Sequence, residues 1–332
     1  MRRLLLMLAA LALPAMAQLP DFYKRVDRVI WIVSDLDAAV AGWDKLGVEA
    51  RGNGDVDSEP EFRGTDTESS YKWAVADFGN VTVDFIQPTD GDDAYAEFLK
   101  KHGSGVMALL HRVPTLDVYM AEIHRMRNLG VGVLQHETIR DSDSGKELQY
   151  VLFDTEAAGK YVVGLVYVPQ SGPPTAFYPT PAKSKARQIT QFAFVVHDLD
   201  SPSRYWAKLG WPEISVTHPA LSDLKYRGQT GQFDSKLGWQ RQGPIVYEWV
   251  LPLKGPTIYE DHIAKHGEGL QHIAFNVPDM NAATADFARA GFRVTQSGAW
   301  GEKDKPGSGR FAYVDLHSLG GTDVELLWDF KP

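Results

Sequence analysis

The sequence predicts an α+β protein made of four βαβββ modules, arranged as two tandem domains. The first observation is a duplication: DLDAAVAGWDKLG at residues 35–47 matches DLDSPSRYWAKLG at residues 198–210, which lie 163 positions later. KKHGSG at residues 100–105 matches AKHGEG at residues 264–269 with an offset of 164. Nearly constant offsets between separate anchors predict that the second half of the chain repeats the first.

Each half divides again into two similar modules. Four times, an apolar β-rich run is followed by a helix start, a helical stretch and a glycine suited to a left-handed helix end. Two or three further β-rich segments then complete a βαβββ unit. The expected first strands are residues 29–33, 106–110, 192–196 and 273–277, with helices that begin near Asp35, Thr115, Asp198 and Pro278 and end at Gly47, Gly130, Gly210 and Gly291. Short connecting helices are expected at residues 94–101 and 258–265.

The first residues have the pattern of a secretory signal peptide. Arg2 and Arg3 form a positive start, residues 4–13 are apolar, and residues 15–17 read Ala-Met-Ala, a small-residue cleavage pattern. The apolar run is shorter than a bilayer-spanning helix. We therefore expect residues 1–17 to be cleaved and the mature protein to be periplasmic or secreted, with a retained membrane anchor as the alternative.

Composition excludes several classes of function. The chain has no cysteine, so disulfides, thiolate ligands and thiol nucleophiles are absent. Its formal charge is −9, and loss of Arg2 and Arg3 would take it to −11. An acidic chain without a basic cluster argues against nucleic acid and against anionic membrane surfaces as partners. We expect a monomer or homodimer that acts on a small molecule.

A segment rich in proline and small polar residues separates the two halves. PQSGPPTAFYPTPAKSKAR at residues 169–187 has the composition of a linker. About 315 residues remain after the signal peptide, and a hydrophobic content of 44% can fill two cores. The predicted domains are residues 22–168 and 188–332.

The stretch KHGEGLQHIAFN at residues 265–276 is the strongest candidate for chemistry. A glycine-flanked turn leads into a strand on which His272 shares a face with Ala274 and Asn276. Such a histidine can turn toward a cavity, or it can be a core histidine bonded to a backbone carbonyl. The duplicate of this stretch keeps the His-Gly-x-Gly turn but has Ala108 where His272 stands. The contrast makes His272 the first candidate.

Two glutamates lie inside apolar strand-like runs. Glu248 lies within residues 246–250 (VYEWV), and Glu325 lies within residues 324–328 (VELLW). A carboxylate buried in such a strand is costly unless it is paired, hydrogen-bonded or bound to a metal. Each glutamate alone could be a satisfied buried carboxylate, but both occupy equivalent places in sister modules.

The paired βαβββ modules, the KHGEGLQHIAF string and the closing GGTDVEL at residues 320–326 resemble the vicinal oxygen chelate superfamily. This group includes glyoxalase I, methylmalonyl-CoA epimerase, extradiol dioxygenases and drug-sequestering proteins. The resemblance covers nearly the whole mature chain, and its motifs are closest to glyoxalase I and methylmalonyl-CoA epimerase. It implies that two modules curl into a cup, with metal ligands on the first and last strands of each module.

Carried over residue by residue, the resemblance implies a metal centre in the second half. The implied ligands are Gln191, Glu248, His272 and Glu325, and the implied catalytic base is Glu325 or Glu248. One nitrogen and three oxygen donors suit a divalent ion (Zn, Ni, Co, Mn or Fe) with water in the open positions. Each residue also has an ordinary structural interpretation, which for Gln191 is a polar residue at a strand edge.

The first half lacks this ligand set. At the offsets of the repeat, the four positions correspond to Arg28, Asp84, Ala108 and Gly164. A metal is not expected there, so this half is either a structural mate or a separate metal-free pocket. His102 and His266, in the matching turns, are expected to orient the connection between modules.

The resemblance implies a metal-dependent isomerase, epimerase or lyase that removes a proton next to a carbonyl and stabilises the enolate. Gln191, in place of the first histidine of extradiol dioxygenases, disfavours ring cleavage. Export disfavours glutathione and acyl-CoA substrates. Trp239, Tyr247, Trp249 and Trp328 near the implied site favour an apolar or aromatic carbonyl compound, although they could be core residues. The alternatives are a non-catalytic protein that binds a drug or aromatic ligand and, less favoured, a ring-cleaving dioxygenase.

Overall fold

The computed structural model describes residues 19–79, 81–140, 147–169 and 187–331. The predicted signal peptide and nearly all of the predicted linker lie outside these ranges, so both remain predictions. Among the residues described, no helix has both the length and the apolar character that crossing a bilayer requires.

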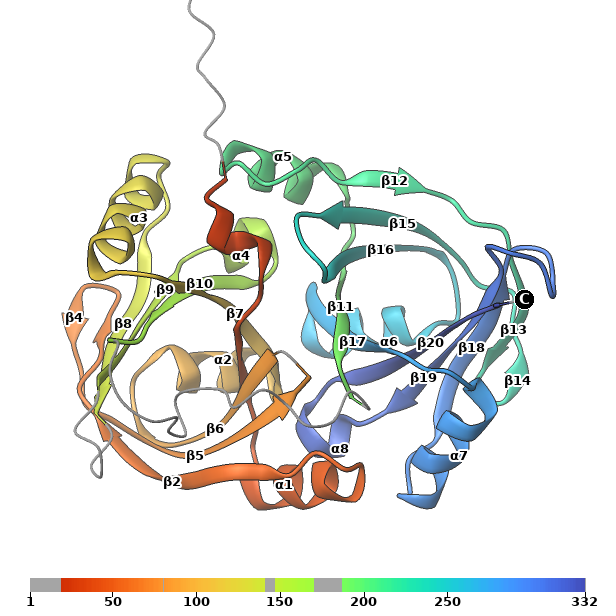
Figure 1. Ribbon diagram of the computed structural model, residues 1–332, viewed down its shortest axis with the longest axis horizontal. Helices are drawn as coiled ribbons and strands as arrows, with labels where there is room; N and C mark the ends of the chain where they lie inside the picture. Colours follow the sequence, from red (N-terminus) through yellow and green to blue (C-terminus); the bar gives the residue numbers. More distant parts are fainter. Residues whose placement is uncertain (1–18, 80, 141–146, 170–186, 332) are drawn as a thin grey trace, which may run out of the picture.

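Two mixed sheets of ten strands each curl into two rings that lie side by side (Figure 1). The first domain contains η1 (Asp21–Lys24), β1 (Arg28–Ile32), α1 (Leu36–Lys45), β2 (Ala50–Ser58), β3 (Glu61–Phe62), β4 (Thr65–Asp66), β5 (Ser69–Phe78), β6 (Val81–Gly91), α2 (Ala94–His102), β7 (Gly105–Val113), α3 (Leu116–Asn128), β8 (Val133–Arg140), β9 (Glu147–Phe153), α4 (Glu156–Gly159) and β10 (Val162–Tyr167). The second contains β11 (Ile189–Val195), α5 (Asp200–Lys208), β12 (Ser215–Thr217), β13 (Leu221–Tyr226), β14 (Gln229–Thr230), β15 (Asp234–Arg241), β16 (Val246–Lys254), α6 (Ile258–His266), β17 (Gly269–Asn276), α7 (Met280–Arg289), β18 (Val294–Trp300), β19 (Gly309–Asp315), α8 (His317–Gly320) and β20 (Asp323–Asp329).

The strand order confirms the duplication and the predicted α+β fold of four modules. The first sheet runs β2-β5-β6-β1-β7-β10-β9-β8-β3-β4, and the second has the same order with every strand number raised by ten. The sequence did not reveal the hairpins β3–β4 and β13–β14, which are inserted in the first module of each domain. Each hairpin pairs with the sister module, β3 with β8 and β13 with β18. β3, β4 and β14 have two residues each, and the apolar residues of β13 do not alternate strictly with polar ones.

The helices begin and end where the residue pattern indicated. Asp35 and Thr115 cap α1 and α3 by accepting hydrogen bonds from the backbone N–H groups of Ala38 and Val118. The four predicted terminal glycines all have positive φ, between 79° and 99°, which other residues adopt only with strain: Gly47, Gly130, Gly210 and Gly291. The connecting helices α2 and α6 also form, and Figure 1 shows each of them inside the ring of its own sheet.

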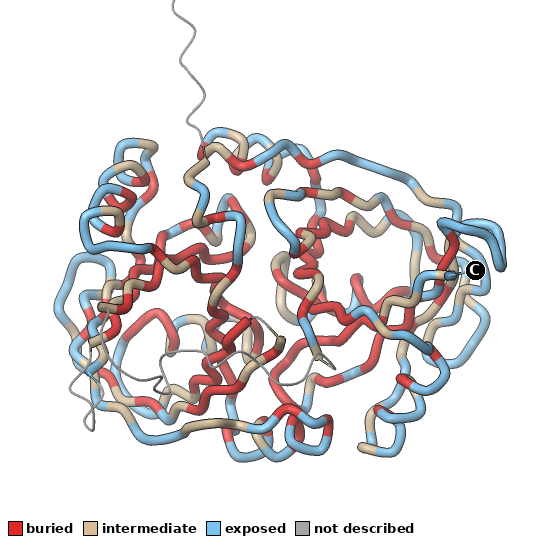
Figure 2. The backbone as a smooth tube through the Cα atoms, viewed as in Figure 1, coloured by how far each residue is buried: buried red, intermediate tan, exposed pale blue. Residues whose placement is uncertain are grey.

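Buried residues follow the inner strands of both rings (Figure 2). They also follow the interface between the two domains, which we call the seam. One core cluster contains residues of both domains. A smaller cluster lies in each cup, the space enclosed by one curled sheet. At the seam, the indole N–H of Trp31 donates to the carbonyl of Gly320 at 2.7 Å, and that of Trp206 donates to the carbonyl of Gly159 at 3.0 Å. A Cβ atom on either glycine would lie 2.5 Å from the facing tryptophan, so only glycine allows this approach.

Candidate metal centre

Four adjacent strands in the second cup bring together the four residues singled out from the sequence. Gln191, Glu248, His272 and Glu325 lie on β11, β16, β17 and β20. Ala193 pairs with both Glu248 and His272, and Ala274 pairs with both Gln191 and Glu325. Cross-strand partners share one face of a sheet. The two small alanines therefore leave space between four polar side chains that point the same way.

The polar atoms of this set lie within hydrogen-bond distance of one another. The amide nitrogen of Gln191 donates to Oε2 of Glu248 at 2.8 Å and to Oε2 of Glu325 at 3.0 Å. Nε2 of His272 lies 3.3 Å from the same oxygen of each glutamate. All four residues are at most 5% exposed. Two carboxylates are thus buried side by side around one imidazole nitrogen.

Gln271 and Asp323 orient the imidazole of His272, and sequence reasoning missed both. Nδ1 of His272 donates to Oε1 of Gln271 at 2.6 Å, and the Gln271 amide donates to Asp323 at 2.5 Å. This chain fixes the tautomer and leaves Nε2 free to face the carboxylates. A bulge makes it possible: Ala193 pairs with His272 and Phe194 with Leu270, so Gln271 is the extra residue. By plain strand alternation, Gln271 would point to the opposite face.

The charges of this centre favour a cation. Burial alone would lower the pKa of His272, but hydrogen bonds and charges from Glu248 and Glu325 raise it to about 9. Burial and the charge of Glu325 raise the pKa of Glu248. Protonation of His272 and binding of a divalent ion are therefore two alternative ways to offset the charge of the carboxylates. A half-turn of the Gln191 amide would add its carbonyl oxygen, giving one nitrogen and three oxygen donors.

Aromatic side chains line the cup around this centre. The hydroxyls of Tyr259 and Tyr313 share a hydrogen bond of 2.7 Å, and the ring of Tyr313 meets that of His272 edge-on at 4.9 Å. Phe233 and Phe311 belong to the same apolar cluster. These residues, rather than the aromatic set suggested by the sequence, form the wall next to the four donors.

The aromatic set suggested by the sequence is mostly core. Tyr247 and Trp249 belong to the large core cluster, and Trp328 packs against it. The reason is strand alternation: the neighbours of Glu248 along β16 point to the opposite face. Trp239, which pairs with Glu248, shares the face of the donors but is only partly buried, and its indole N–H donates to Thr217.

The segment 297–310 contains the end of β18 and the start of β19. An exposed loop at residues 301–307 joins these two strands.

The equivalent place in the first cup is a closed ion pair. Nε of Arg28 lies 2.5 Å from Oδ2 of Asp84, and both side chains are buried. Asp84 also accepts hydrogen bonds from Trp73 at 3.0 Å and from Tyr150 at 3.2 Å. The other two positions are Ala108 and Gly164 on β7 and β10, which offer no side-chain ligand.

Comparison with known proteins places this arrangement in a family. The profile of the Glyoxalase/Bleomycin resistance protein/Dioxygenase superfamily matches residues 27–150 and 190–313, one match in each half. The chain belongs to this superfamily. The predicted resemblance to this superfamily is therefore confirmed.

Solved structures show the same fold at low sequence identity. A triple mutant of 4-hydroxymandelate synthase from Streptomyces coelicolor is 18% identical, with a TM-score of 0.59 and 92% of each chain covered. An Mn(II)-bound glyoxalase from Novosphingobium aromaticivorans is 14% identical, with a TM-score of 0.47, 93% of this chain and 83% of that chain covered. In this chain, Glu248, His272 and Glu325 each place one possible ligand atom within 4.8 Å of the others, so they form a group that could hold a metal ion.

Proposed function

We propose that the protein is a metal-dependent isomerase, epimerase or lyase that removes a proton next to the carbonyl of an apolar or aromatic small molecule. One observation carries the proposal: two buried carboxylates, an oriented imidazole and an amide converge in the second cup. The sister cup keeps the fold without this set, so folding alone does not require it. From the first residues of the sequence, we also propose that the protein is exported.

Gln191, Glu248, His272 and Glu325 would hold the ion, whose identity among Zn, Ni, Co, Mn and Fe the donor set leaves open. When bound, such an ion supplies a Lewis acid that stabilises negative charge on the carbonyl oxygen of the substrate. The hydrogen bond from His272 to Gln271 keeps Nε2 directed at this place. Because all donors are buried, the wall of the cup excludes competing water.

One of the two glutamates would act as the base. The C–H bond next to the carbonyl breaks, its proton passes to a carboxylate oxygen, and its electron pair moves toward the carbonyl oxygen. Return of the proton to the opposite face or to a neighbouring carbon completes an epimerisation or isomerisation, and departure of a β-substituent instead completes a lyase reaction. A carboxylate in an apolar wall, with a pKa raised as for Glu248, is suited to this role.

The test combines metal analysis with proton exchange. Purified wild type, His272→Ala and Glu325→Ala are compared by elemental analysis, with the exposed Glu302→Ala as control. We expect both site variants to hold one divalent ion fewer than the wild type and the control. Equal metal content in all four proteins would contradict the site. A panel of aromatic carbonyl compounds in D₂O, followed by NMR, should show deuterium incorporation only with metal-loaded wild type and control.

A second candidate is a protein that binds an aromatic ligand without chemistry, favoured by the closed wall of Tyr259, Tyr313, Phe233 and Phe311. Tight binding of panel compounds by metal-free protein, without deuterium incorporation under any condition, would support it. Oxygen consumption with Fe(II) and catechols would instead indicate a ring-cleaving dioxygenase.

A further inference from the structure

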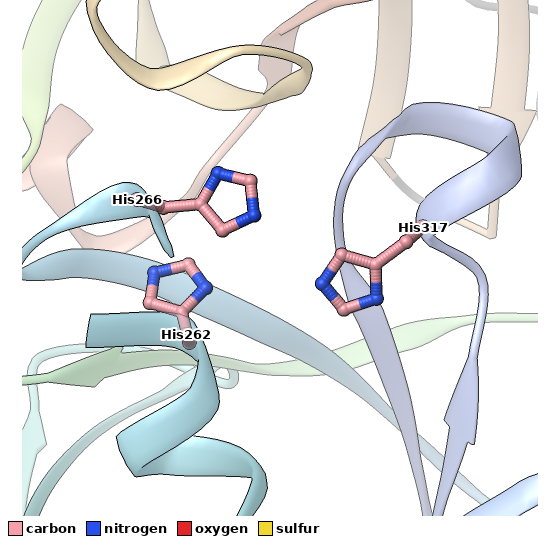
Figure 3. A group of neighbouring side chains, drawn as sticks. All are labelled: His262, His266 and His317. Atoms are coloured by element: carbon pink, nitrogen blue, oxygen red, sulfur yellow. The ribbon is translucent and has the colours of Figure 1, made fainter. Parts of the chain in front are cut away.

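Three histidines of the second domain form a separate cluster at the seam between the domains. His262 and His266 lie one turn apart on the same side of α6, and His317 begins α8. One ring nitrogen of each lies within 4.8 Å of the others. Figure 3 shows the three rings arranged around one common space.

Two of the nitrogens that face this space lack a hydrogen-bond partner among the described residues. They are Nδ1 of His262 and Nε2 of His266, and both atoms are buried. His262 as a whole is only 7% exposed. Leaving a buried polar atom without a hydrogen-bond partner costs free energy, so these two nitrogens are expected to have a partner that the described residues do not provide. A ligand between the rings would supply one.

The opposite ring nitrogens hold two of the rings in the orientation a metal ligand needs. Nδ1 of His266 donates to the carbonyl of His102 at 2.6 Å. Nδ1 of His317 lies 2.9 Å from Oδ1 of Asp315 and 3.6 Å from Asp323. Metal-binding histidines commonly donate their second N–H to a carbonyl or a carboxylate in this way. Nε2 of both His266 and His317 is thereby left to face the common space.

The first domain shows the same place without the cluster. At the offsets of the repeat, His262, His266 and His317 correspond to Phe98, His102 and Glu156. There, Nε2 of His102 engages Glu156 at 2.5 Å, and the ring of Phe98 lies against that of His102 at 4.9 Å. His102 and His266 also exchange Nδ1–carbonyl hydrogen bonds across the seam, which agrees with the orienting role expected from the sequence. Only the second domain adds two further imidazoles.

We propose that His262, His266 and His317 bind a second divalent ion of the zinc type, which clamps α6 to α8 at the domain seam. Imidazole ligands suit Zn²⁺, and three of them leave a fourth position for water. Zn–N bonds of about 2.0–2.1 Å place tetrahedral nitrogens about 3.4 Å apart. The three nitrogens lie within 4.8 Å of one another, so a bound ion would draw α6 and α8 closer together while the hydrogen bonds of His266 and His317 keep their rings oriented.

This site is distinct from the four-donor centre, although Asp323 lies between the two. Asp323 accepts the hydrogen bond of Gln271, which orients His272, and its other oxygen approaches His317. The two ions would therefore share a neighbour but no ligand. Each ion can therefore be removed without the other by substituting its own ligands.

The experiment counts ions in the full chain, without an affinity tag and stripped with EDTA, by zinc titration calorimetry and elemental analysis. We expect two zinc ions in the wild type and one in the variant His262→Phe/His317→Glu, which places the sister residues at both positions. His272→Ala/Glu325→Ala should also bind one, and the combined variant none. The exposed His124→Phe is the control and should bind two. His317→Ala alone provides a second variant that does not alter the buried His262.

Cobalt reports which site is filled. Co²⁺ in the His272→Ala/Glu325→Ala protein should give the intense visible bands of a four-coordinate ion, and these bands should be absent from the combined variant, which also carries His262→Phe/His317→Glu. Equal zinc stoichiometry and affinity in that variant and the wild type would overturn the proposal. Zinc binding in the wild type that disappears entirely with His272→Ala/Glu325→Ala would overturn it as well. If the four-donor centre does not bind zinc, the wild type should hold one ion. Both His262→Phe/His317→Glu and His317→Ala should then lose this ion, which would support the proposal.

Discussion

The two cups share one architecture and differ in how they neutralise charge. Their strand orders are the same, and both contain a bulge in the first strand of their second module. The extra residue is Met107 on β7 in the first cup and Gln271 on β17 in the second. In the first cup, the permanent cation Arg28 balances Asp84. In the second, two carboxylates face a neutral amide and an imidazole that is charged only when protonated. At these equivalent positions, the second cup thus carries more buried negative charge than the first.

This difference explains why one copy is a candidate metal centre and the other is not. The buried carboxylate of Asp84 already has the guanidinium of Arg28 as its counter-ion. This guanidinium also occupies the space where a metal would have to bind. Two buried carboxylates with at most one proton between them are costly without a cation. The side chains at these four positions therefore distinguish an internal salt bridge in the first cup from a cluster that could bind an ion in the second.

The largest expected effect is the loss of proton abstraction when one carboxylate of the second cup is neutralised. Glu248→Gln and Glu325→Gln keep the side-chain volume but remove a base and an anionic ligand. We expect kcat/KM to fall by about 10³-fold, or about 4 kcal/mol of transition-state stabilisation, for at least one of the two. The measurement is the rate of deuterium exchange on the compound identified in the carbonyl panel. The variant Asp84→Asn in the first cup should leave this rate unchanged in the folded fraction.

Exchanging the residues that distinguish the cups should separate stability from metal binding. Arg28→Gln leaves Asp84 as a buried, unbalanced carboxylate, and we expect the free energy of unfolding to fall by about 3–5 kcal/mol with unchanged metal content. Gln191→Arg places the guanidinium of the first cup among the carboxylates of the second and should remove the ion. Urea unfolding and elemental analysis measure the two effects. Retention of the metal in Gln191→Arg would refute the charge argument.

Acid should destabilise the first domain through a histidine that the second domain lacks. Burial lowers the pKa of His111 to about 4, whereas the equivalent residue on β17 is Phe275. Since the unfolded chain binds this proton near pH 6.5, stability is lost as the pH falls from about 6.5 to about 4, by about 3 kcal/mol. His111→Phe should remove this part of the pH dependence. Urea unfolding at pH 7 and pH 4 measures it, and an equal pH dependence in variant and wild type would contradict the assignment.

The repeat could be predicted because it depends on local order along the chain, whereas the set Gln191, Glu248, His272 and Glu325 was implied by the resemblance to the vicinal oxygen chelate superfamily. Constant offsets fix which strands are equivalent, and each donor lies on a strand whose type is evident from its neighbours. For Tyr247 and Trp249, the sequence left open a place beside the site or in the core, and the structure places both in the core, since residues adjacent to a donor on a strand point away from it. The correct wall residue Tyr259 lies on α6, and its contact with Tyr313 depends on how that helix sits inside the sheet.

Other features depend on irregular backbone or on distant contacts, which sequence order does not reveal. Gln271 reaches His272 only because a bulge turns it to the same face. His262 and His317 meet only because α8, a helix of four residues, lies next to α6. Neither a bulge nor such a short helix leaves a periodic pattern that could have been detected.

The smallest expected effect concerns the start of the two helices inside the cups, which the copies cap differently. In α6, Thr257 and Glu260 form a capping box, whereas Asp93 alone caps α2. Thr257→Ala should lower the free energy of unfolding by about 1 kcal/mol, because one backbone N–H at the start of α6 loses its acceptor. As α6 also carries Tyr259 and two of the seam histidines, zinc affinity in the His272→Ala/Glu325→Ala background should weaken in parallel. Asp93→Ala should cost a similar amount of stability but leave zinc affinity unchanged. If both variants weakened zinc binding equally, the effect would come from general loosening of the seam rather than from α6.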